Sequence, residues 1–142
     1  MSNPIYPCLW FESQAKEAAT FYCSLFKDSR IISETPLVVM FEINGKQVMG
    51  LNGGPHFKLT EAFSFVVECE NQQEIDFYWE KLTDGGEESM CGWLKDRYGV
   101  SWQIIPAILL ELMNDPVKAE KTVAAFMPMR KLDIATLLKA VE

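Results

Sequence analysis

The chain has 142 residues, of which 49% are hydrophobic, and its 13 basic against 20 acidic residues give a net charge of −7. This length suits a single domain, or two small modules that share a core, and the hydrophobic fraction excludes a disordered chain. The acidic balance, without any basic run, argues against nucleic acid and anionic membranes as partners. Apolar runs stay well short of the roughly 18 residues of a membrane span, and the N-terminus lacks a secretory-signal pattern.

The four cysteines are Cys8, Cys23, Cys69 and Cys91, and no two of them form a C-x-x-C pair. We therefore expect neither a zinc ribbon nor a thioredoxin-type redox motif. Cys8, Cys23 and Cys69 stand in apolar runs, which predicts small buried core residues. This cysteine usage is typical of a reduced, cytoplasmic protein.

The first half of the chain predicts one strand, one helix and three further strands. Residues 5–11 predict a strand, and Ser13 is placed to cap a helix whose apolar positions run from Ala15 to Phe26 at helical spacing. Strands are predicted at 29–34, 37–43 and 47–52, the last two joined by an Asn-Gly turn at positions 44 and 45. Residues 52–55, Asn-Gly-Gly-Pro, predict a loop.

The second half repeats this order. Residues 63–68 form a nearly all-apolar run, which predicts a strand covered on both faces. Asn71 and Glu74 outline a capping box for a helix that ends at residues 84–86, Asp-Gly-Gly. A short strand at 87–90 and a hairpin at 91–106 complete the unit, and Asp96 and Arg97 at the hairpin tip are expected to pair on the surface.

The chain therefore predicts an α+β fold built as a single domain, 1–142, from two βαβββ modules at 1–59 and 60–106. A helical tail is predicted at 107–142. Asp115 with Pro116 and, further on, Asp133 mark two helix starts, while Pro128 marks a helix end. The tail helices are apolar enough to need cover, either from their own sheet or from a second chain.

Several motifs resemble one branch of the vicinal oxygen chelate superfamily, which includes glyoxalase I, bleomycin-resistance proteins and extradiol dioxygenases. The branch is the 3-demethylubiquinone-9 3-methyltransferase-like, or PhnB-like, family. The resemblance rests on residues 8–11, 14–15, 21–22, 51–57, 91–99, 101–103 and 129–134. It implies that the two modules form a cupped mixed sheet with helices outside, and that the protein is a homodimer. The family name is difficult to reconcile with these residues, because no Gly-rich turn between a parallel strand and a helix is present to hold a methyl donor.

The resemblance also implies where a metal would bind. In metal-using relatives His, Glu or Gln from the first and fourth strands of both modules hold a divalent ion. Those positions fall near Pro7, Gly50, Ser64 and Gln103, of which only Gln103 carries a suitable ligand. The single histidine, His56, lies in the predicted loop. We therefore expect no metal and no cofactor.

Period-2 alternation predicts which residues line the cup. Four strands contribute to the predicted lining. The residues are Ser101, Gln103 and Ile105 of the last strand, Gly50 and Asn52 of the fourth, Ser64 and Val66 of the fifth, and Pro7, Leu9 and Phe11 of the first. The candidate ligand-binding residues are Asn52, His56, Ser64, Trp93, Trp102 and Gln103. Each has a structural alternative: the tryptophans suit the core, Gln103 the sheet backbone, Asn52 the glycine turn, and His56 the exposed loop.

Three functions follow. The first is a binding module of the bleomycin-resistance type, which sequesters a small hydrophobic or aromatic ligand without turnover. The second is a metal-independent enzyme acting on a small carbonyl or quinone-like substrate, with Gln103, Asn52 or His56 as its polar groups. The third, ranked last, is the methyltransferase of the family name. The sequence leaves open whether the protein is an enzyme.

Overall fold

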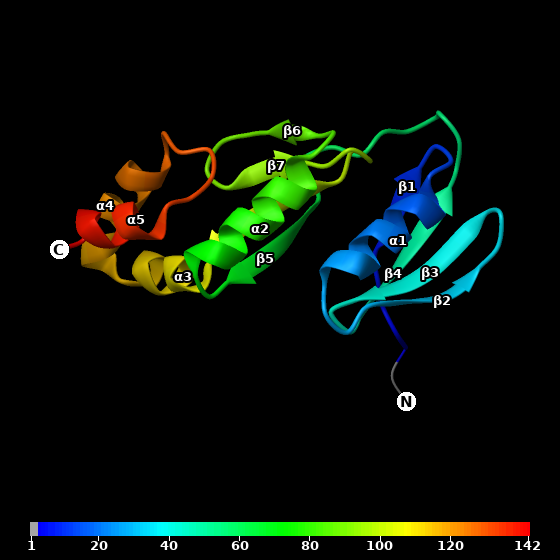
Figure 1. Ribbon diagram of the computed structural model, residues 1–142, viewed down its shortest axis with the longest axis horizontal. Helices are drawn as coiled ribbons and strands as arrows, with labels where there is room; N and C mark the ends of the chain where they lie inside the picture. Colours follow the sequence, from blue (N-terminus) through cyan, green and yellow to red (C-terminus); the bar gives the residue numbers. More distant parts are fainter. Residues whose placement is uncertain (1–2) are drawn as a thin grey trace. The chain divides into compact units, whose positions relative to one another are not determined.

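The computed structural model describes residues 3–142 (Figure 1). The chain divides into two compact units, Met1–Leu59 and Thr60–Glu142. Each unit contains a four-stranded mixed sheet, and the second also carries the C-terminal helices. The α+β class and the duplicated βαβββ order predicted from the sequence are confirmed.

The first unit has one helix and a sheet whose strand order is β1-β4-β3-β2. Strand β1 runs parallel to β4, and the other neighbours are antiparallel. The elements are β1 (Cys8–Phe11), α1 (Ala15–Leu25), β2 (Arg30–Glu34), β3 (Val38–Ile43) and β4 (Lys46–Asn52). Parallel pairing of the first and last strands requires a crossover, and α1 supplies it.

Helix α1 lies very close to its sheet because its inner face is small. Ala15, Ala18 and Ala19 are fully buried. A Cβ atom at Gly50 would lie 3.2 Å from the Cβ of Ala15 and within van der Waals range of Phe11 and Phe41. Gly50 is therefore a point of close approach between strand and helix, where a larger side chain would push α1 outward.

This packing overturns part of the predicted cup. Gly50 faces α1, and Leu9 and Phe11 are buried in the same core. In this module the residues predicted to line the cup face α1 instead. The sequence does not separate the two faces, because buried residues on both faces look alike. Ser13 does not cap α1 either: Gln14 is the cap residue and makes no side-chain cap bond.

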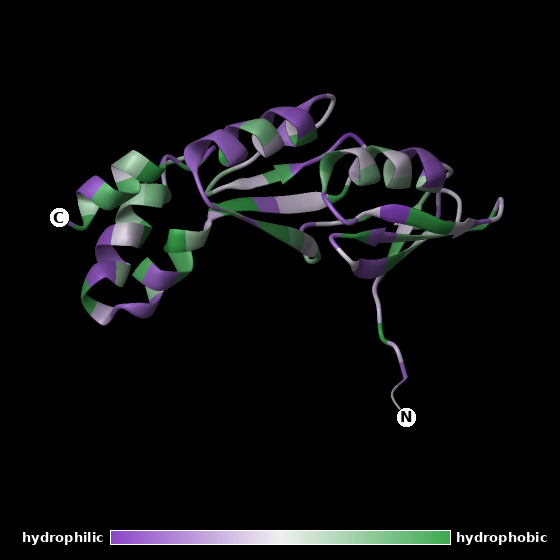
Figure 2. Ribbon diagram, turned by 60° about the horizontal axis from the view of Figure 1, so that its bottom comes forward, coloured by the Kyte–Doolittle hydropathy of each residue, from purple (hydrophilic) through white to green (hydrophobic). Residues whose placement is uncertain are grey.

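The second unit repeats the topology with strand order β5-β8-β7-β6, again with the first and last strands parallel. Its elements are β5 (Ser64–Cys69), α2 (Gln72–Thr83), β6 (Glu87–Glu88), β7 (Trp93–Lys95) and β8 (Ser101–Pro106). The predicted capping box of α2 is confirmed: the Glu74 amide donates to Asn71 Oδ1 at 2.9 Å. Hydrophilic and hydrophobic residues both recur along α2 (Figure 2), as expected of a helix with one face on a sheet and the other toward solvent.

The tip of the second hairpin is folded around a buried carboxylate. Asp96 is 3% exposed, and its Oδ1 accepts hydrogen bonds from the amides of Tyr98 (2.8 Å) and Val100 (3.0 Å). Its Oδ2 accepts from the Trp102 indole at 2.9 Å. The prediction that Asp96 pairs on the surface is therefore wrong, and Arg97 instead reaches Asp84 at 3.4 Å. A turn carboxylate can organise backbone amides, and here it does so below the surface.

The tail forms α3 (Ala107–Asn114), α4 (Pro116–Phe126) and α5 (Ile134–Ala140). As predicted, Asp115 caps α4 and Asp133 caps α5 through their side chains. The segment between α4 and α5 returns to the sheet, where the amides of Cys91 and Gly92 donate to the carbonyls of Met129 (2.7 Å) and Arg130 (2.8 Å). The tail shares one hydrophobic cluster with the end of β8, made of Ile105, Leu109, Leu112, Leu132 and Leu137.

Two predictions of burial are wrong. Cys8 is exposed, although Cys69 is buried as expected. Strand β5 is covered on one face only, since Val66 is 52% exposed and Glu68 is also exposed. Among the described residues no helix has both the length and the apolar character that crossing a membrane would need.

Candidate functional site: a pocket on the second sheet

The two faces of the second sheet have different characters. The face toward α2 is core: the rings of Phe65 and Trp102 lie 4.9 Å apart, and Leu94 is the cross-strand partner of Trp102. Trp102 is 1% exposed and donates its indole hydrogen to Asp96. Trp102 is therefore a core residue, which is the structural alternative that the sequence left open.

The opposite side of this sheet, called the open face below, carries the polar side chains. By strand register it presents Ser64 and Val66 of β5, Trp93 and Lys95 of β7, and Ser101 and Gln103 of β8. Gln103 donates from Nε2 to the Ser64 hydroxyl at 3.0 Å. Trp93 is the cross-strand partner of Gln103. The structure thus brings together three of the predicted candidates, Ser64, Trp93 and Gln103.

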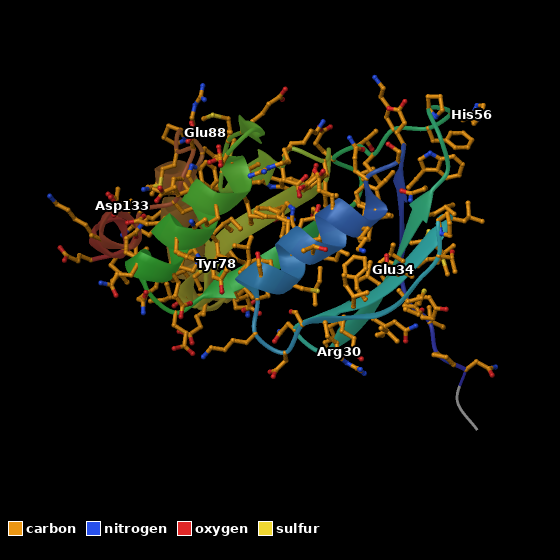
Figure 3. The ribbon with its side chains drawn as sticks, turned by 45° about the vertical axis from the view of Figure 1, so that its right-hand side comes forward. Arg30, Glu34, His56, Tyr78, Glu88 and Asp133 are labelled. Carbon is orange, nitrogen blue, oxygen red and sulfur yellow. The ribbon has the colours of Figure 1, made fainter. Side chains whose placement is uncertain are left out.

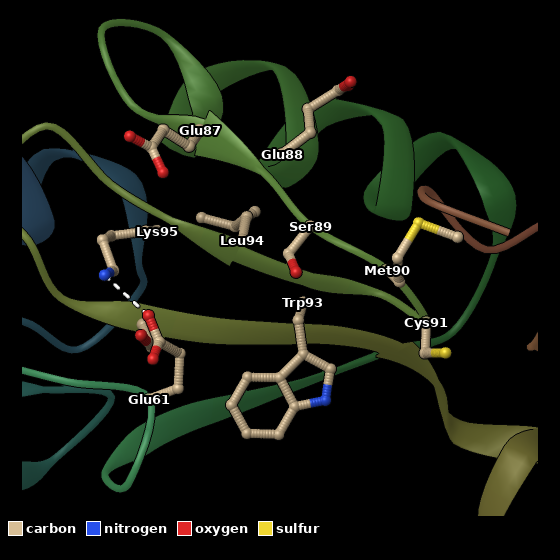
Figure 4. Close-up of a pocket in the computed structure, with 10 residues that line it drawn as sticks. Glu61, Glu87, Glu88, Ser89, Met90, Cys91, Trp93, Leu94 and Lys95 are labelled. Atoms are coloured by element: carbon tan, nitrogen blue, oxygen red, sulfur yellow. Dashed lines mark ion pairs between the residues drawn. The ribbon is translucent and has the colours of Figure 1, made fainter.

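A cavity of about 390 Å³ opens between the open face and the segments beside it. Its size lies at the lower end of the range of ligand pockets, which is roughly 300 to 1,000 Å³. The residues that line it are Glu61, Glu87, Glu88, Ser89, Met90, Cys91, Trp93, Leu94, Lys95 and Ser101. All of them belong to the second unit (Figure 4).

One side of the cavity holds an ion pair. The ammonium of Lys95 lies 2.6 Å from Oε1 of Glu61, a residue of the segment that leads into β5. The hydrogen bond from Lys95 holds the pKa of the Glu61 carboxyl below its usual value. The Glu61 side chain is 65% exposed, so water screens this attraction and the pair can open at little cost.

A second polar group in the cavity has no partner. Ser101 is 1% exposed, and its hydroxyl oxygen is buried without a hydrogen bond to any described residue. A buried hydroxyl without a partner costs about 1 to 3 kcal/mol, so such groups are rare in folded proteins. Ser101 stands beside Lys95 on one neighbouring strand and beside Ser64 on the other.

Not every lining residue points into the cavity. Glu88 pairs across β6 and β7 with Leu94, and its carboxylate accepts from the Trp79 indole at 2.7 Å. Arg130 of the tail lies 3.6 Å from the other oxygen of Glu88. Figure 4 shows the Glu88 side chain and the Trp93 ring pointing away from each other. Glu88 is therefore a structural residue that ties α2 and the tail to the sheet edge.

The two remaining candidates belong to the first unit. Asn52 accepts a hydrogen bond from the Ala15 amide at 2.9 Å and donates to the Pro36 carbonyl at 3.1 Å. It takes over the capping of α1 that was predicted for Ser13, and it joins β4 to the loop before β3. Asn52 therefore has a structural role, on the side of the sheet opposite to the one predicted.

His56 lies in the loop after β4 and is exposed (Figure 3). The glycines before it sit under an aromatic cover: Trp10 donates its indole hydrogen to the Gly54 carbonyl at 2.9 Å and stacks edge-on with Phe57. A Cβ atom at Gly53 would collide with the Trp10 ring. The Asn-Gly-Gly-Pro motif is thus explained by packing around Trp10.

The residues present do not fit the divalent ion of metal-using relatives. Of the four expected positions, Pro7 offers no ligand side chain and Gly50 faces α1. Gln103 and Ser64 are hydrogen-bonded to each other, which leaves two weak neutral donors where a tight site needs three or four ligands. Within residues 3–142, no cluster of three or more His, Cys, Asp or Glu side chains is placed to hold a metal.

Lys95 and Glu61 were missed from the sequence. Lys95 was the easier to find, because it stands two residues after Trp93 on the same strand and so shares its face. Glu61 gives no such signal: it belongs to a segment without regular structure and reaches Lys95 only in the folded chain.

Comparison with known proteins now decides the family. The model of the 3-demethylubiquinone-9 3-methyltransferase family matches residues 3–105. The chain belongs to this family. The match stops at the end of β8, so helices α3 to α5 lie beyond it. No curated protein matches the chain.

Solved structures agree with this family assignment. A PhnB protein from Bacillus cereus, described as a 3-demethylubiquinone-9 3-methyltransferase, is 35% identical over 74% of this chain and 100% of its own, with a TM-score of 0.67. Protein PA1353 from Pseudomonas aeruginosa is 18% identical over 74% and 98% of the two chains, with a TM-score of 0.60. FosX from Listeria monocytogenes, a fosfomycin resistance protein solved with Mn(II) and sulfate, is 15% identical over 73% and 89%, with a TM-score of 0.53.

The last two similarities show the fold alone. A glyoxalase-related enzyme from Fulvimarina pelagi, 13% identical with a TM-score of 0.52, shares this fold as well. The predicted family and the glyoxalase/bleomycin-resistance fold are therefore confirmed.

Proposed function

We propose that the protein binds a small aromatic or hydrophobic molecule in the pocket of the second sheet, without turnover. The observation that carries this proposal is the cavity of about 390 Å³ beside Trp93, in which an aromatic wall meets a few polar groups. That combination is typical of small-molecule sites. An indole ring offers a large rigid surface for a planar ligand at low entropic cost.

Binding is favoured over catalysis by the side chains of the cavity. A hydrolytic or transfer site needs a nucleophile within hydrogen-bond reach of a base. The Cys91 thiol, the most nucleophilic lining group, instead donates to the Met127 carbonyl at 3.6 Å. The Ser101 hydroxyl has no hydrogen-bond partner within residues 3–142. An enzyme acting on a small carbonyl or quinone-like substrate remains our second hypothesis.

Methyl transfer ranks last, in spite of the family name. In the described chain the glycines of residues 53 and 54 lead into a segment without helix up to residue 63. A methyl donor of the nucleoside type is usually held where a Gly-rich turn opens a helix after a parallel strand. The residues of this chain therefore offer no recognisable place for one.

We also infer that the protein is a cytoplasmic homodimer. The family resemblance supports a dimer, and the tail leaves Leu110, Met113 and Val117 partly or largely exposed. Light scattering coupled to size exclusion tests this directly. A mass of twice 16.2 kDa supports the dimer, and a mass of 16.2 kDa contradicts it.

A ligand screen tests the proposed function. We expect planar aromatic compounds to raise the melting temperature of the wild-type protein and to quench its tryptophan fluorescence, because binding only to the folded state stabilises it. Trp93→Ala should abolish both responses, whereas Trp10→Ala, in the first unit, should leave ligand affinity unchanged. Failure of every aromatic compound to bind wild-type protein would overturn the proposal. Release of a chemically altered product would favour the enzyme instead.

A further inference from the structure

The unpartnered hydroxyl of Ser101 lies beside a cation. Lys95 and Ser101 are cross-strand partners on the open face, and both line the cavity. The hydroxyl oxygen is buried, so a ligand in the cavity reaches it only when the groups that cover it move. The Lys95 ammonium and the Ser101 hydroxyl are therefore two donors on neighbouring strands of one sheet face. Such a pair suits one acceptor group with two oxygens.

The structure already holds a carboxylate on one of these donors. Glu61 places Oε1 2.6 Å from the Lys95 ammonium, and the dashed line in Figure 4 marks this contact beside the Trp93 ring. Glu61 comes from an irregular segment and its side chain is 65% exposed. Because exposed ion pairs contribute little to stability, this carboxylate can leave for solvent at low cost. Until it leaves, the Glu61 carboxylate occupies the position beside the Lys95 ammonium that a carboxylate from solution would take.

Charge decides between the possible ligands. The lining residues carry three carboxylates, Glu61, Glu87 and Glu88, and one ammonium, Lys95. An anion that merely entered beside them would be repelled. An anion that replaces Glu61 leaves the charge next to Lys95 unchanged, and the released Glu61 is screened by water. A neutral carbonyl is too weak an acceptor to displace a carboxylate from an ammonium.

We propose that the pocket takes a planar aromatic carboxylate. Its carboxylate replaces that of Glu61 on Lys95 and accepts a hydrogen bond from the Ser101 hydroxyl, while its ring lies against Trp93. This inference rests on the proposed function and adds the class of ligand. Glu61 then acts as an internal competitor that satisfies Lys95 until a ligand arrives.

Three compounds with one ring system test the proposal: 2-naphthoate, 2-acetylnaphthalene and 2-ethylnaphthalene, each titrated calorimetrically into the full-length protein. We expect 2-naphthoate to bind at least tenfold more tightly than the ketone or the hydrocarbon. Ser101→Ala should weaken 2-naphthoate by roughly tenfold or more, since it removes a hydrogen bond to a charged group. Lys95→Met should abolish its binding, and Glu61→Gln should strengthen it several-fold.

Matched control variants lie outside the cavity. Ser24→Ala, Lys46→Met and Glu111→Gln change the same residue types at exposed positions and should leave all three affinities unchanged. Equal affinity for 2-ethylnaphthalene and 2-naphthoate, or no loss in Ser101→Ala, would overturn the carboxylate proposal while leaving aromatic binding intact. An unchanged affinity in Glu61→Gln would contradict the role of Glu61. If none of the three compounds bound, the proposed function itself would fail.

Discussion

The two modules share one topology but use the faces of their sheets differently. In the first, the face away from α1 carries Trp10, Met40 and Met49, and Trp10 is held down on the Gly53-Gly54 loop. In the second, the open face carries Ser64, Lys95, Ser101 and Gln103 beside Trp93. The duplicated fold therefore provides two similar frames, and in this chain the second combines polar groups with a cavity.

In each module one polar side chain organises a loop, although the two loops hold different places in the fold. Asn52 ends β4 and joins two segments of the first unit through two hydrogen bonds near the surface. Asp96 organises the second hairpin from within, through three bonds to its carboxylate. A charged group buried with partners is costly to remove, because the partners are left without an acceptor.

Removing these two side chains should show the largest difference between the modules. We expect Asp96→Ala to lower the free energy of unfolding by about 3 to 5 kcal/mol, because two amides and the Trp102 indole lose a charged acceptor. Asn52→Ala should cost about 1 to 2 kcal/mol. Urea denaturation measures both. A greater loss from Asn52→Ala than from Asp96→Ala would contradict the comparison.

Two glycines test the packing of two further loops, Gly86 between α2 and β6 and Gly53 after β4. A Cβ atom at Gly86 would collide with the backbone carbonyl of Lys95, whereas one at Gly53 would collide with the Trp10 side chain. Because backbone yields less than a side chain, Gly86→Ala should cost about 3 kcal/mol and Gly53→Ala about 2 kcal/mol. Thermal denaturation with Ala124→Gly, an ordinary exposed helix site, gives the reference scale of about 1 kcal/mol.

Alanine substitutions of two serines on the open face should change the free energy of unfolding in opposite directions. Ser101→Ala removes an unpartnered buried hydroxyl and should raise the free energy of unfolding by up to about 1 kcal/mol in the absence of ligand. Ser64→Ala takes away the acceptor of Gln103 and should lower it by about 1 kcal/mol. Chemical denaturation of ligand-free protein checks both signs. A destabilised Ser101→Ala variant would mean that the hydroxyl is already satisfied.

The smallest effects concern the cysteines. Burial raises the pKa of the Cys69 thiol to about 12, with a further contribution from Glu74. At pH 8 a thiol reagent should therefore label exposed Cys8 well before Cys69, as peptide mapping after timed labelling will show. The folded state prefers the neutral thiol, so this group's contribution to stability is complete below pH 9 and is lost between pH 9 and about 12. Cys69→Ala should remove that part of the alkaline destabilisation.

Local signals in the sequence predicted local structure well. The Asn71, Asp115 and Asp133 caps and the helix and strand order depend on residues that lie within a few positions of each other. The cap of α1 was missed because its acceptor, Asn52, lies 37 positions from the amide of Ala15. Asp96 was placed on the surface because turn acids usually are solvated, and only the fold brings the Trp102 indole to it.

The candidate site was predicted in part. Ser64, Trp93 and Gln103 share one face of the second sheet, since period-2 alternation holds within a strand, and of these three only Trp93 lines the cavity. The same rule failed for Leu9, Phe11 and Gly50, because alternation does not say which face a helix covers. The position of Glu61 beside Lys95 and the unpartnered hydroxyl of Ser101 depend on tertiary contacts alone. No pattern in the sequence therefore predicts them.

The most direct test maps where a ligand binds, using backbone and indole NMR shifts of labelled protein during a titration with 2-naphthoate. We predict that the shifts concentrate on Trp93, Lys95 and Ser101 and on the Glu61 segment, with the loop around His56 unaffected. Shifts centred on Asn52 and His56 instead, or a titration without shifts at saturating ligand, would contradict a binding site on the second sheet.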